Sequence, residues 1–331
     1  MARSISARSD SFDLKAPFRI SRGIKTVAHV ITVEVRAEGQ LGRGEGIPYI
    51  HYGESLEGTL ADVDTVRSAV EGGATRADLQ KLLPAGAARN AIDCALWDLE
   101  ARLAGTSVGA LGAGVYPPHP VVSAVTIGIG EPPDMAAEAR KVAHAPLIKI
   151  KVDRRDPQSQ IQAVRGAAPA ARLIVDPNES WTITDLEALQ PLLREARVDL
   201  LEQPLPVDAD DGLMNFKSCV PICADESAHI TADLAKLAGR YQYVNIKLDK
   251  TGGLTEAIAM AAAARAQGFG LMLGCMVCSS LSIAPAMQLA GDMDFVDLDG
   301  PLWLASDYPD GVVDKAGILH PSAPHFWGRA I

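Results

Sequence analysis

Lys149 and Lys151 are the first residues whose type and spacing indicate chemistry. They flank Ile150 in the run Leu147-Ile-Lys-Ile-Lys-Val152. Because side chains of a strand alternate between its faces, a spacing of two puts both ammonium groups on one face, roughly 7 Å apart at about 3.3 Å per residue. Two like charges on an inward face are costly unless anions compensate them.

Three carboxylates and another lysine end the apolar runs that follow. Asp176 lies in Val-Asp-Pro-Asn-Glu, Glu202 in Leu-Leu-Glu-Gln-Pro and Asp225 in Cys-Ala-Asp-Glu-Ser. Lys247 ends the next run, Tyr-Val-Asn-Ile-Lys. Three hard oxygen donors without a His or Cys suit Mg²⁺, which prefers octahedral oxygen coordination. We therefore predict one Mg²⁺ per subunit.

This set of residues suits the removal of a proton next to a carboxylate. That C–H group is a weak acid, and the dianionic enolate needs positive charge in place, which a divalent ion supplies as a Lewis acid. A lysine that acts as a base must be neutral, so its pKa must fall below about 10.4. Burial and neighbouring cations both lower it. Two lysines on opposite faces of one carbon would permit racemisation or epimerisation.

Eight β-rich apolar runs from residue 121 onward must position these groups. They end 22 to 26 residues apart, and a strand, helix and two loops occupy about that length. The runs end near Thr126, Lys151, Asp176, Glu202, Asp225, Lys247, Leu273 and Asp297. We predict a (β/α)8-type TIM barrel over residues 119–302, with its site at the C-terminal strand ends. An open doubly wound sheet is disfavoured because no G-x-G-x-x-G follows any run. Around such a ring, Lys247 stands across from Lys151.

Residues 1–118 are expected to form a separate α+β capping domain. Val27–Val35 is rich in β-branched residues and is followed by Gly39–Gly46, which we interpret as a glycine-rich turn. Ala88–Leu103 carries its apolar residues on one face of a helix. Residues 303–331 are expected to pack back on the capping domain.

These motifs together resemble the enolase superfamily, and within it the muconate-lactonising subgroup. The resemblance rests on the Lys-Ile-Lys motif, the three carboxylates, and a lysine five residues before Gly252-Gly253. It implies Mg²⁺ binding by Asp176, Glu202 and Asp225, acid/base catalysis by Lys151 and Lys247, and enolate stabilisation by Lys149. The mandelate-racemase branch would need a His base from a later strand, and no His lies between His229 and His320.

The last predicted strand adds an acidic pair. Asp297 and Asp299 share a face, where they can hold an ammonium group by charge-assisted contacts. This Asp-x-Asp resembles the dipeptide epimerases of the subgroup, in which the pair holds the free α-ammonium group of the substrate. Arg22 suits a substrate side-chain carboxylate, as in the L-Ala-D/L-Glu epimerases, and Thr126 matches a substrate-lining position.

The expected function is therefore that of an isomerase, a Mg²⁺-dependent dipeptide epimerase that converts L-Ala-L-Glu to L-Ala-D-Glu. By resemblance alone, this activity belongs to the recycling of murein (cell-wall) peptides. N-acylamino acid racemase, o-succinylbenzoate synthase and muconate cycloisomerase share the metal and lysine set and remain alternatives. A non-catalytic barrel that binds small molecules is a more distant one, because such a chain should have lost a lysine or a carboxylate.

The amino-acid composition argues against some classes of binding partner and favours one cellular location. The 331 residues are 48% hydrophobic and 22% charged, which is typical of a soluble globular protein. The net charge of −10 argues against nucleic acid or an anionic membrane as a partner. The uncharged stretch 266–291 is too polar for a spanning helix, and residues 1–12 lack the apolar segment of a signal peptide. Five cysteines, an odd number, fit a cytoplasmic location. A homo-oligomer is compatible with the sequence.

Overall fold

The computed structural model describes residues 3–329. Its strands are β1 (Ser4–Ile20), β2 (Gly23–Ala37), β3 (Gln40–Gly46), β4 (Val121–Val122), β5 (Val125–Ile127), β6 (Leu147–Lys151), β7 (Arg172–Asp176), β8 (Leu200–Glu202), β9 (Ile222–Ala224), β10 (Tyr243–Ile246), β11 (Gly270–Gly274), β12 (Phe295–Asp297), β13 (Val313–Lys315) and β14 (Ile318–His320). Its α-helices are α1 (Leu56–Glu71), α2 (Arg76–Leu82), α3 (Ala87–Leu103), α4 (Pro132–Lys141), α5 (Pro157–Ala167), α6 (Ile183–Glu195), α7 (Leu234–Leu237), α8 (Leu248–Thr251), α9 (Leu254–Ala266) and α10 (Ser280–Ala286).

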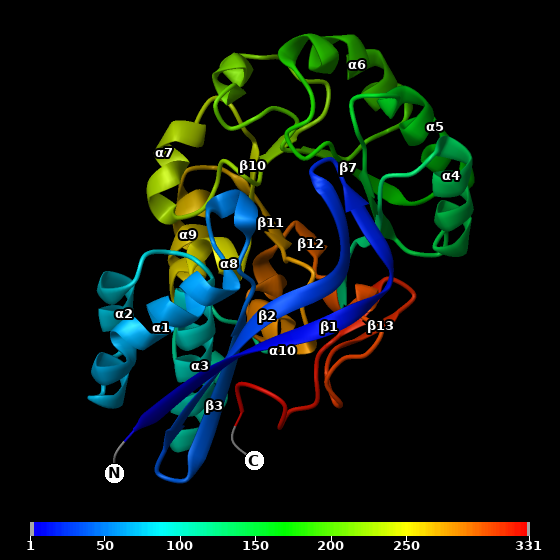
Figure 1. Cartoon of the computed structure of the whole chain (residues 1–331). Helices are drawn as coiled ribbons and strands as arrows, with labels where there is room; N and C mark the ends of the chain where they lie inside the picture. Colours follow the sequence, from blue (N-terminus) through cyan, green and yellow to red (C-terminus); the bar gives the residue numbers. More distant parts are fainter. Residues whose placement is uncertain (1–2, 330–331) are drawn as a thin grey trace.

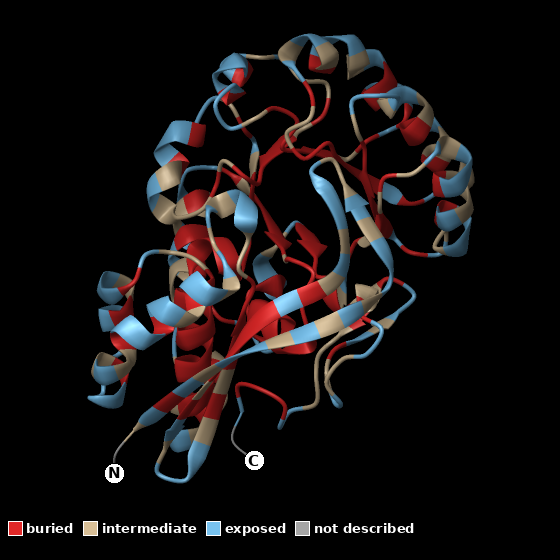
Figure 2. Cartoon of the chain, viewed as in Figure 1, coloured by how far each residue is buried: buried red, intermediate tan, exposed pale blue. Residues whose placement is uncertain are grey.

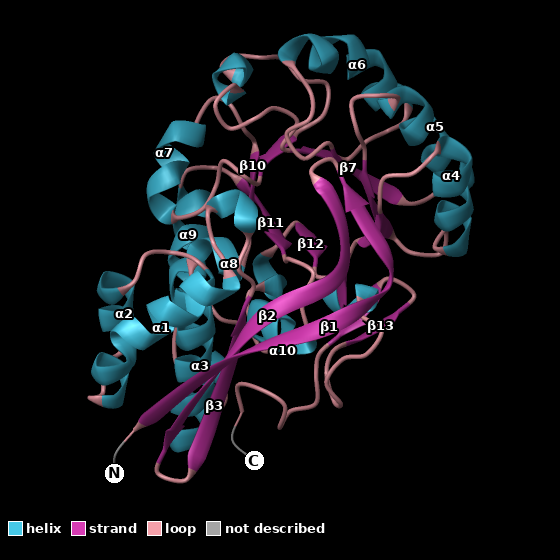
Figure 3. Cartoon of the chain, in the orientation of Figure 1, coloured by secondary structure: helices cyan, strands magenta, loops and turns pink. Residues whose placement is uncertain are grey.

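Strands β5 to β12 form one parallel sheet in consecutive order, as the spacing of the apolar runs predicts. Each strand ends within one residue of its predicted end. The first and last strands approach each other where the Ala124 amide donates to the Val296 carbonyl at 2.8 Å, so the sheet is nearly closed into a barrel. Helices cover its outside, and its strands are buried (Figures 2 and 3). The predicted TIM-barrel fold is confirmed.

The N-terminal part is an antiparallel sheet in the order β1-β2-β3, packed with helices α1 to α3. β1 and β2 are 17 and 15 residues long, and their hairpin extends across the barrel in Figure 1. The tip of this hairpin, Ser21-Arg22, is thereby carried from the capping part to the barrel strands.

The prediction of a turn over Gly39–Gly46 was wrong for most of its length. Only Glu38 and Gly39 form the turn, and strand β3 begins at Gln40. A Cβ atom at each of the three glycines of β3 would lie 2.1 Å from a backbone carbonyl oxygen of α3. The glycines at 42, 44 and 46 therefore allow strand and helix to pack closely, and they were mistaken for turn residues.

Helix α3 also fixes the capping part to the barrel segment that follows Lys247. Arg89 donates to the carbonyls of Thr251 at 2.6 Å and Gly252 at 3.1 Å. At Gly252 a Cβ atom would lie 2.5 Å from Arg89 Nε, and both Gly252 and Gly253 have positive φ. The glycine pair is thus required by the close approach of α3 and by the backbone conformation.

The C-terminal segment contacts both parts. β14 pairs with β13 and with β4, while Trp327 Nε1 donates to the Arg43 carbonyl at 2.8 Å. We propose a division of the chain into three parts, residues 1–118, 119–302 and 303–331.

Among the helices between residues 3 and 329, none combines the length and apolar character needed to cross a membrane.

Candidate active site

The residues predicted to do chemistry gather at the C-terminal ends of the barrel strands. None of them exposes more than 8% of its surface except Arg22. A cavity that is open to the outside lies between these strand ends and the capping hairpin. Its lining includes Arg22, Thr126, Lys149, Lys151, Asp225, Lys247, Asp297 and Asp299.

Lys151 and Lys247 reach this cavity from opposite sides of the barrel. Lys151 ends β6 and Lys247 directly follows β10, and three strands separate β6 from β10 in either direction round the ring. The Lys151 ammonium group is paired with Asp176, and Lys247 Nζ lies 2.6 Å from Asp225 Oδ2. Each lysine is thus held by one of the predicted metal ligands.

Lys149 lies between the carboxylates. Its Nζ is 2.7 Å from Glu202 Oε2, 3.2 Å from Asp176 Oδ2 and 2.7 Å from Asp297 Oδ2. Burial alone would lower the pKa of Lys149, but these carboxylates outweigh burial and raise it above its ordinary value. Its ammonium group joins the predicted metal ligands to the acidic pair of the last strand.

The pKa of Lys247 moves opposite to the direction expected for a base. Burial lowers it, but the carboxylates of Asp225 and Glu202 outweigh burial and raise it. Burial and the Asp176 carboxylate raise the pKa of Glu202 to about 8. The raised pKa values of Lys247 and Glu202 both indicate an excess of negative charge around these two residues.

The donor set fits Mg²⁺. Asp176, Glu202 and Asp225 are buried oxygen donors at one rim, and Glu202 Oε2 already contacts a cation, the Lys149 ammonium group at 2.7 Å. Within residues 3–329, no three acidic, histidine or cysteine side chains have donor atoms gathered closely enough to hold a metal ion as they stand. The lysine ammonium groups make the contacts that a cation would make in their place.

Asp297, the last residue of β12, and Asp299, two residues beyond it, lie on the wall of the same cavity. Asp299 accepts a hydrogen bond from the Thr126 amide at 2.7 Å, and burial next to the Asp297 carboxylate raises the pKa of Asp299 to about 7. Asp297 Oδ2 contacts Lys149, whereas its Oδ1 is buried without a hydrogen-bond partner among the described residues. The pair thus retains an acceptor for a cationic group.

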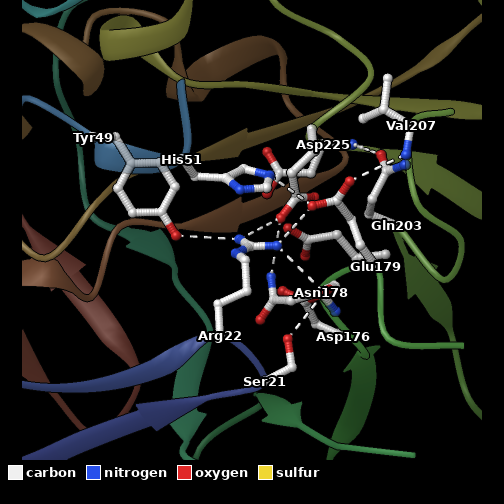
Figure 4. A network of polar contacts seen from close by, with 12 residues as sticks. Ser21, Arg22, Tyr49, His51, Asp176, Asn178, Glu179, Gln203, Val207 and Asp225 are labelled. Atoms are coloured by element: carbon white, nitrogen blue, oxygen red, sulfur yellow. Dashed lines mark hydrogen bonds and ion pairs between the residues drawn. The ribbon is translucent and has the colours of Figure 1, made fainter. Parts of the chain in front are cut away.

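Arg22 enters the site from the tip of the β1–β2 hairpin (Figure 4). Its guanidinium group lies 2.9 Å from Glu179 Oε2 and 2.7 Å from Glu226 Oε1. Asn178 and Glu179, which follow Asp176, have φ of 45° and 66°. This left-handed backbone is uncommon for residues other than glycine and places the Glu179 carboxylate beside the hairpin.

Several residues of the site were not predicted. Lys250 Nζ is completely buried and lies 2.6 Å from Asp225 Oδ1, so that one carboxylate holds two lysines. Glu226, which follows Asp225 in the sequence, pairs with Arg22. Lys25 lines the cavity from β2. The adjacent acids at 225 and 226 and the spacing of three between the lysines at 247 and 250 were visible signals, whereas nothing near Lys25 in the sequence marks it.

Two family models match the chain. Residues 2–112 match the mandelate racemase / muconate lactonizing enzyme N-terminal domain, and residues 134–323 match the enolase C-terminal domain-like family. Together these matches cover most of the chain and both parts of the fold.

Characterised relatives and solved structures align over nearly the full length. The L-Ala-D/L-Glu epimerase of Escherichia coli is 48% identical, with 96% of this chain and 99% of that protein covered. The N-acetyl-D-glutamate racemase of a Pseudoalteromonas species is 41% identical, with 91% and 96% covered.

Among solved structures, an enolase family member from Agrobacterium tumefaciens has bound sodium and L-Ala-L-Glu. It is 46% identical, with a TM-score of 0.96 and 98% and 100% of the two chains covered. The dipeptide epimerase of Enterococcus faecalis, complexed with Mg and L-Leu-L-Tyr, is 30% identical, with a TM-score of 0.90 and 99% of each chain covered.

Proposed function

This chain belongs to the mandelate racemase / muconate lactonizing enzyme family of the enolase superfamily, and from that premise we propose that it is a Mg²⁺-dependent dipeptide epimerase. It inverts the Cα of the second residue, with L-Ala-L-Glu and L-Ala-D-Glu as its substrate pair. The similarity to the epimerase of Escherichia coli and to the Agrobacterium structure with L-Ala-L-Glu supports this assignment.

The choice of substrate rests on Asp297 Oδ1, which is buried beside Asp299 and has no hydrogen-bond partner among residues 3–329. A second carboxylate, with its pKa raised to about 7, stands next to it. A free α-ammonium group supplies three N–H donors and a positive charge at this point. An N-acylated amino acid has no such cation to offer.

Lys151 and Lys247 act as the acid and the base. One neutral lysine takes the proton from the substrate Cα, while the other, as an ammonium group, gives a proton to the opposite face of the same carbon. No net proton is gained or lost, and the configuration is inverted. Three strands separate β6 from β10 on each side of the ring, which supports a position of the substrate carbon between the two lysine side chains.

Mg²⁺ would be held by Asp176, Glu202 and Asp225, and it would supply Lewis-acid stabilisation of the negative charge on the substrate carboxylate. Lys149 stays next to these carboxylates and adds a fixed positive charge where the dianion forms. Thr126 fixes Asp299 through its backbone amide and lines the substrate space.

An N-acylglutamate racemase is the second candidate, because the Pseudoalteromonas relative is 41% identical. It requires the same lysines but makes no use of Asp297 and Asp299. A change at Asp299 should therefore lower the activity of a dipeptide epimerase but leave that of an N-acylglutamate racemase unchanged.

The decisive experiment follows deuterium incorporation at the glutamyl Cα in D₂O with Mg²⁺ present. We expect exchange and epimerisation of L-Ala-L-Glu, and much slower reaction of N-acetyl-L-Glu. Asp299→Asn keeps the acceptor for the Thr126 amide but removes the charge, and should lower kcat/KM for the dipeptide by about 10- to 100-fold. Absence of exchange with every dipeptide, or faster reaction of N-acetyl-L-Glu, would refute the assignment.

We further propose that the enzyme works in the cytoplasm on peptides released from murein. The five cysteines are free, as expected of a reducing compartment.

A further inference from the structure

The two lysines assigned as acid and base are held in place by different parts of the molecule. Lys151 lies inside the sheet, where β6 pairs with β7 and Lys151 is aligned with Asp176. Lys247 lies just beyond the end of β10, whose pairing with β11 stops at Ile246 and Leu273. The sheet therefore fixes the backbone of Lys151 directly, whereas the backbone of Lys247 needs a further support.

That support begins with α8, a single helical turn that follows Lys247 directly. The Lys247 carbonyl accepts hydrogen bonds from the amides of Lys250 and Thr251, each at 3.0 Å. One turn is too short to be stable in isolation, so contacts with other elements must hold it. A tilt of α8 would turn the backbone of Lys247 and displace its ammonium group.

The capping part contacts α8 through Asp249. Asp249 Oδ1 accepts a hydrogen bond from the amide of Ile47, directly after β3, and another from Asn90 Nδ2 of α3, both at 2.8 Å. Asn90 Nδ2 also donates to the Glu45 carbonyl at 3.1 Å. Helix α3 lies against α8 (Figure 1). Asp249 thus joins α8 to the sheet and to a helix of the capping part.

The barrel holds the same turn from the other side. Lys250 Nζ donates to the Asn245 carbonyl at 2.8 Å and to the Asp225 carbonyl at 2.6 Å. Asp249 itself is buried and is not among the residues between 3 and 329 that line the substrate cavity. An effect of Asp249 on the reaction must therefore come through the residues that it holds.

We propose that Asp249 is a positioning residue for Lys247, through which the capping part sets the orientation of the base on one face of the substrate carbon. The inference rests on the proposed epimerase function and deepens it. Because the sheet fixes Lys151, a defect at Asp249 should impair the proton transfers made by Lys247 and spare those made by Lys151.

The test measures deuterium incorporation separately for L-Ala-L-Glu and L-Ala-D-Glu, from initial rates in D₂O with Mg²⁺. Lys247→Ala first identifies the epimer whose exchange depends on Lys247. Asp249→Ala should lower kcat/KM for exchange of that epimer about 10- to 100-fold, the cost of a small displacement of a catalytic group, and leave the other epimer within about threefold. Epimerisation should fall equally in both directions, since each direction uses both lysines.

Three further variants separate positioning from folding. Asp249→Asn keeps an oxygen acceptor for both donors and should restore the wild-type ratio of the two exchange rates. Asn90→Ala removes one of the two hydrogen bonds to Asp249 and should shift the ratio in the same direction by a smaller factor, which tests the inference even if Asp249→Ala does not fold. Asp98→Ala, the matched control, removes a buried α3 carboxylate that accepts from the amides of Arg43 at 3.0 Å and Gly328 at 2.7 Å, and should leave the ratio unchanged.

The outcomes separate this inference from the proposed function. Equal losses of exchange for both epimers in Asp249→Ala and Asn90→Ala, or no loss in either variant, would overturn the inference while the epimerase assignment stands. A shifted ratio in Asp98→Ala would also overturn it, because the effect would then come from a general loosening of α3. If the wild type exchanges neither epimer, the proposed function is refuted, and this inference with it.

Discussion

Lys151 and Lys247 face one cavity from opposite sides of the barrel, each with its ammonium group held by a buried aspartate. This relationship separates inversion from simple proton exchange, since two groups on one side could remove a proton but could not return it to the other face. It also links acid/base chemistry to the carboxylates assigned to the metal.

Removal of one lysine should uncouple exchange from inversion. In Lys151→Ala the remaining base can reach only one face of the carbon, and the same holds for Lys247→Ala from the other side. We expect epimerisation to fall by about 10²- to 10⁴-fold in either variant. Deuterium should still enter one epimer of the substrate, a different one for each variant, as measured by NMR. Exchange of both epimers by a single-lysine variant would contradict the arrangement.

Binding of Mg²⁺ should raise thermal stability. A ligand at 100 times its dissociation constant stabilises the folded state by about 2.7 kcal/mol, which calorimetry detects as a higher Tm. Asp225→Asn should lose most of this shift and should also release Lys250, whose Nζ lies 2.6 Å from the carboxylate. Removal of the ion with EDTA should abolish exchange, and its return should restore it. An equal Tm shift in Asp225→Asn would argue against this ligand.

Glu45 should make stability depend on pH. Burial raises its pKa from 4.5 to about 8, although Ser279 donates two hydrogen bonds to it. Because the folded-state pKa lies above the unfolded value, the contribution to stability is complete below pH 4.5 and is lost as the pH rises through 8. At about 1.36 kcal/mol per pH unit, the loss is on the order of 5 kcal/mol.

The measurement is the free energy of unfolding of wild type and Glu45→Gln between pH 5 and 9. The variant should show a flatter pH dependence than wild type, because its side chain cannot ionise. Glu187→Gln, a change at an exposed helix position, serves as the control and should leave the slope as it is. Parallel curves for wild type and Glu45→Gln would show that this carboxyl group does not titrate as stated.

The close packing of β3 on α3 predicts a sharp difference between two glycines. A Cβ atom at Gly44 would lie 2.1 Å from the Ala91 carbonyl oxygen, so Gly44→Ala must push strand and helix apart. We expect a loss of about 2–3 kcal/mol, typical of overpacking. At Gly166, inside α5, a Cβ atom meets nothing within 4 Å, and Gly166→Ala should stabilise by about 0.5–1 kcal/mol. Urea denaturation of both variants tests the pair.

The regular spacing of apolar runs was enough to predict the barrel and its rim. Parallel strands joined by helices end at one edge, so polar residues at successive strand ends must meet there. For this reason Lys149, Lys151 and Asp176, each in or at the end of a strand, could be assigned to one site from sequence alone. The end of a strand can be recognised from the local sequence, and the barrel topology then brings successive strand ends to one rim.

Tertiary contacts decided what the sequence left open or indicated wrongly. The glycines of β3 looked like turn residues because their partner, α3, lies about 50 residues away in the chain. The pKa of Lys247 rises because Asp225 and Glu202, from two other strands, face it. The sequence marked Arg22 for a substrate carboxylate, yet in the folded chain its guanidinium group pairs with the protein's own carboxylates at 179 and 226. Composition and spacing determine which element a residue joins, whereas its charge partners depend on how distant elements meet.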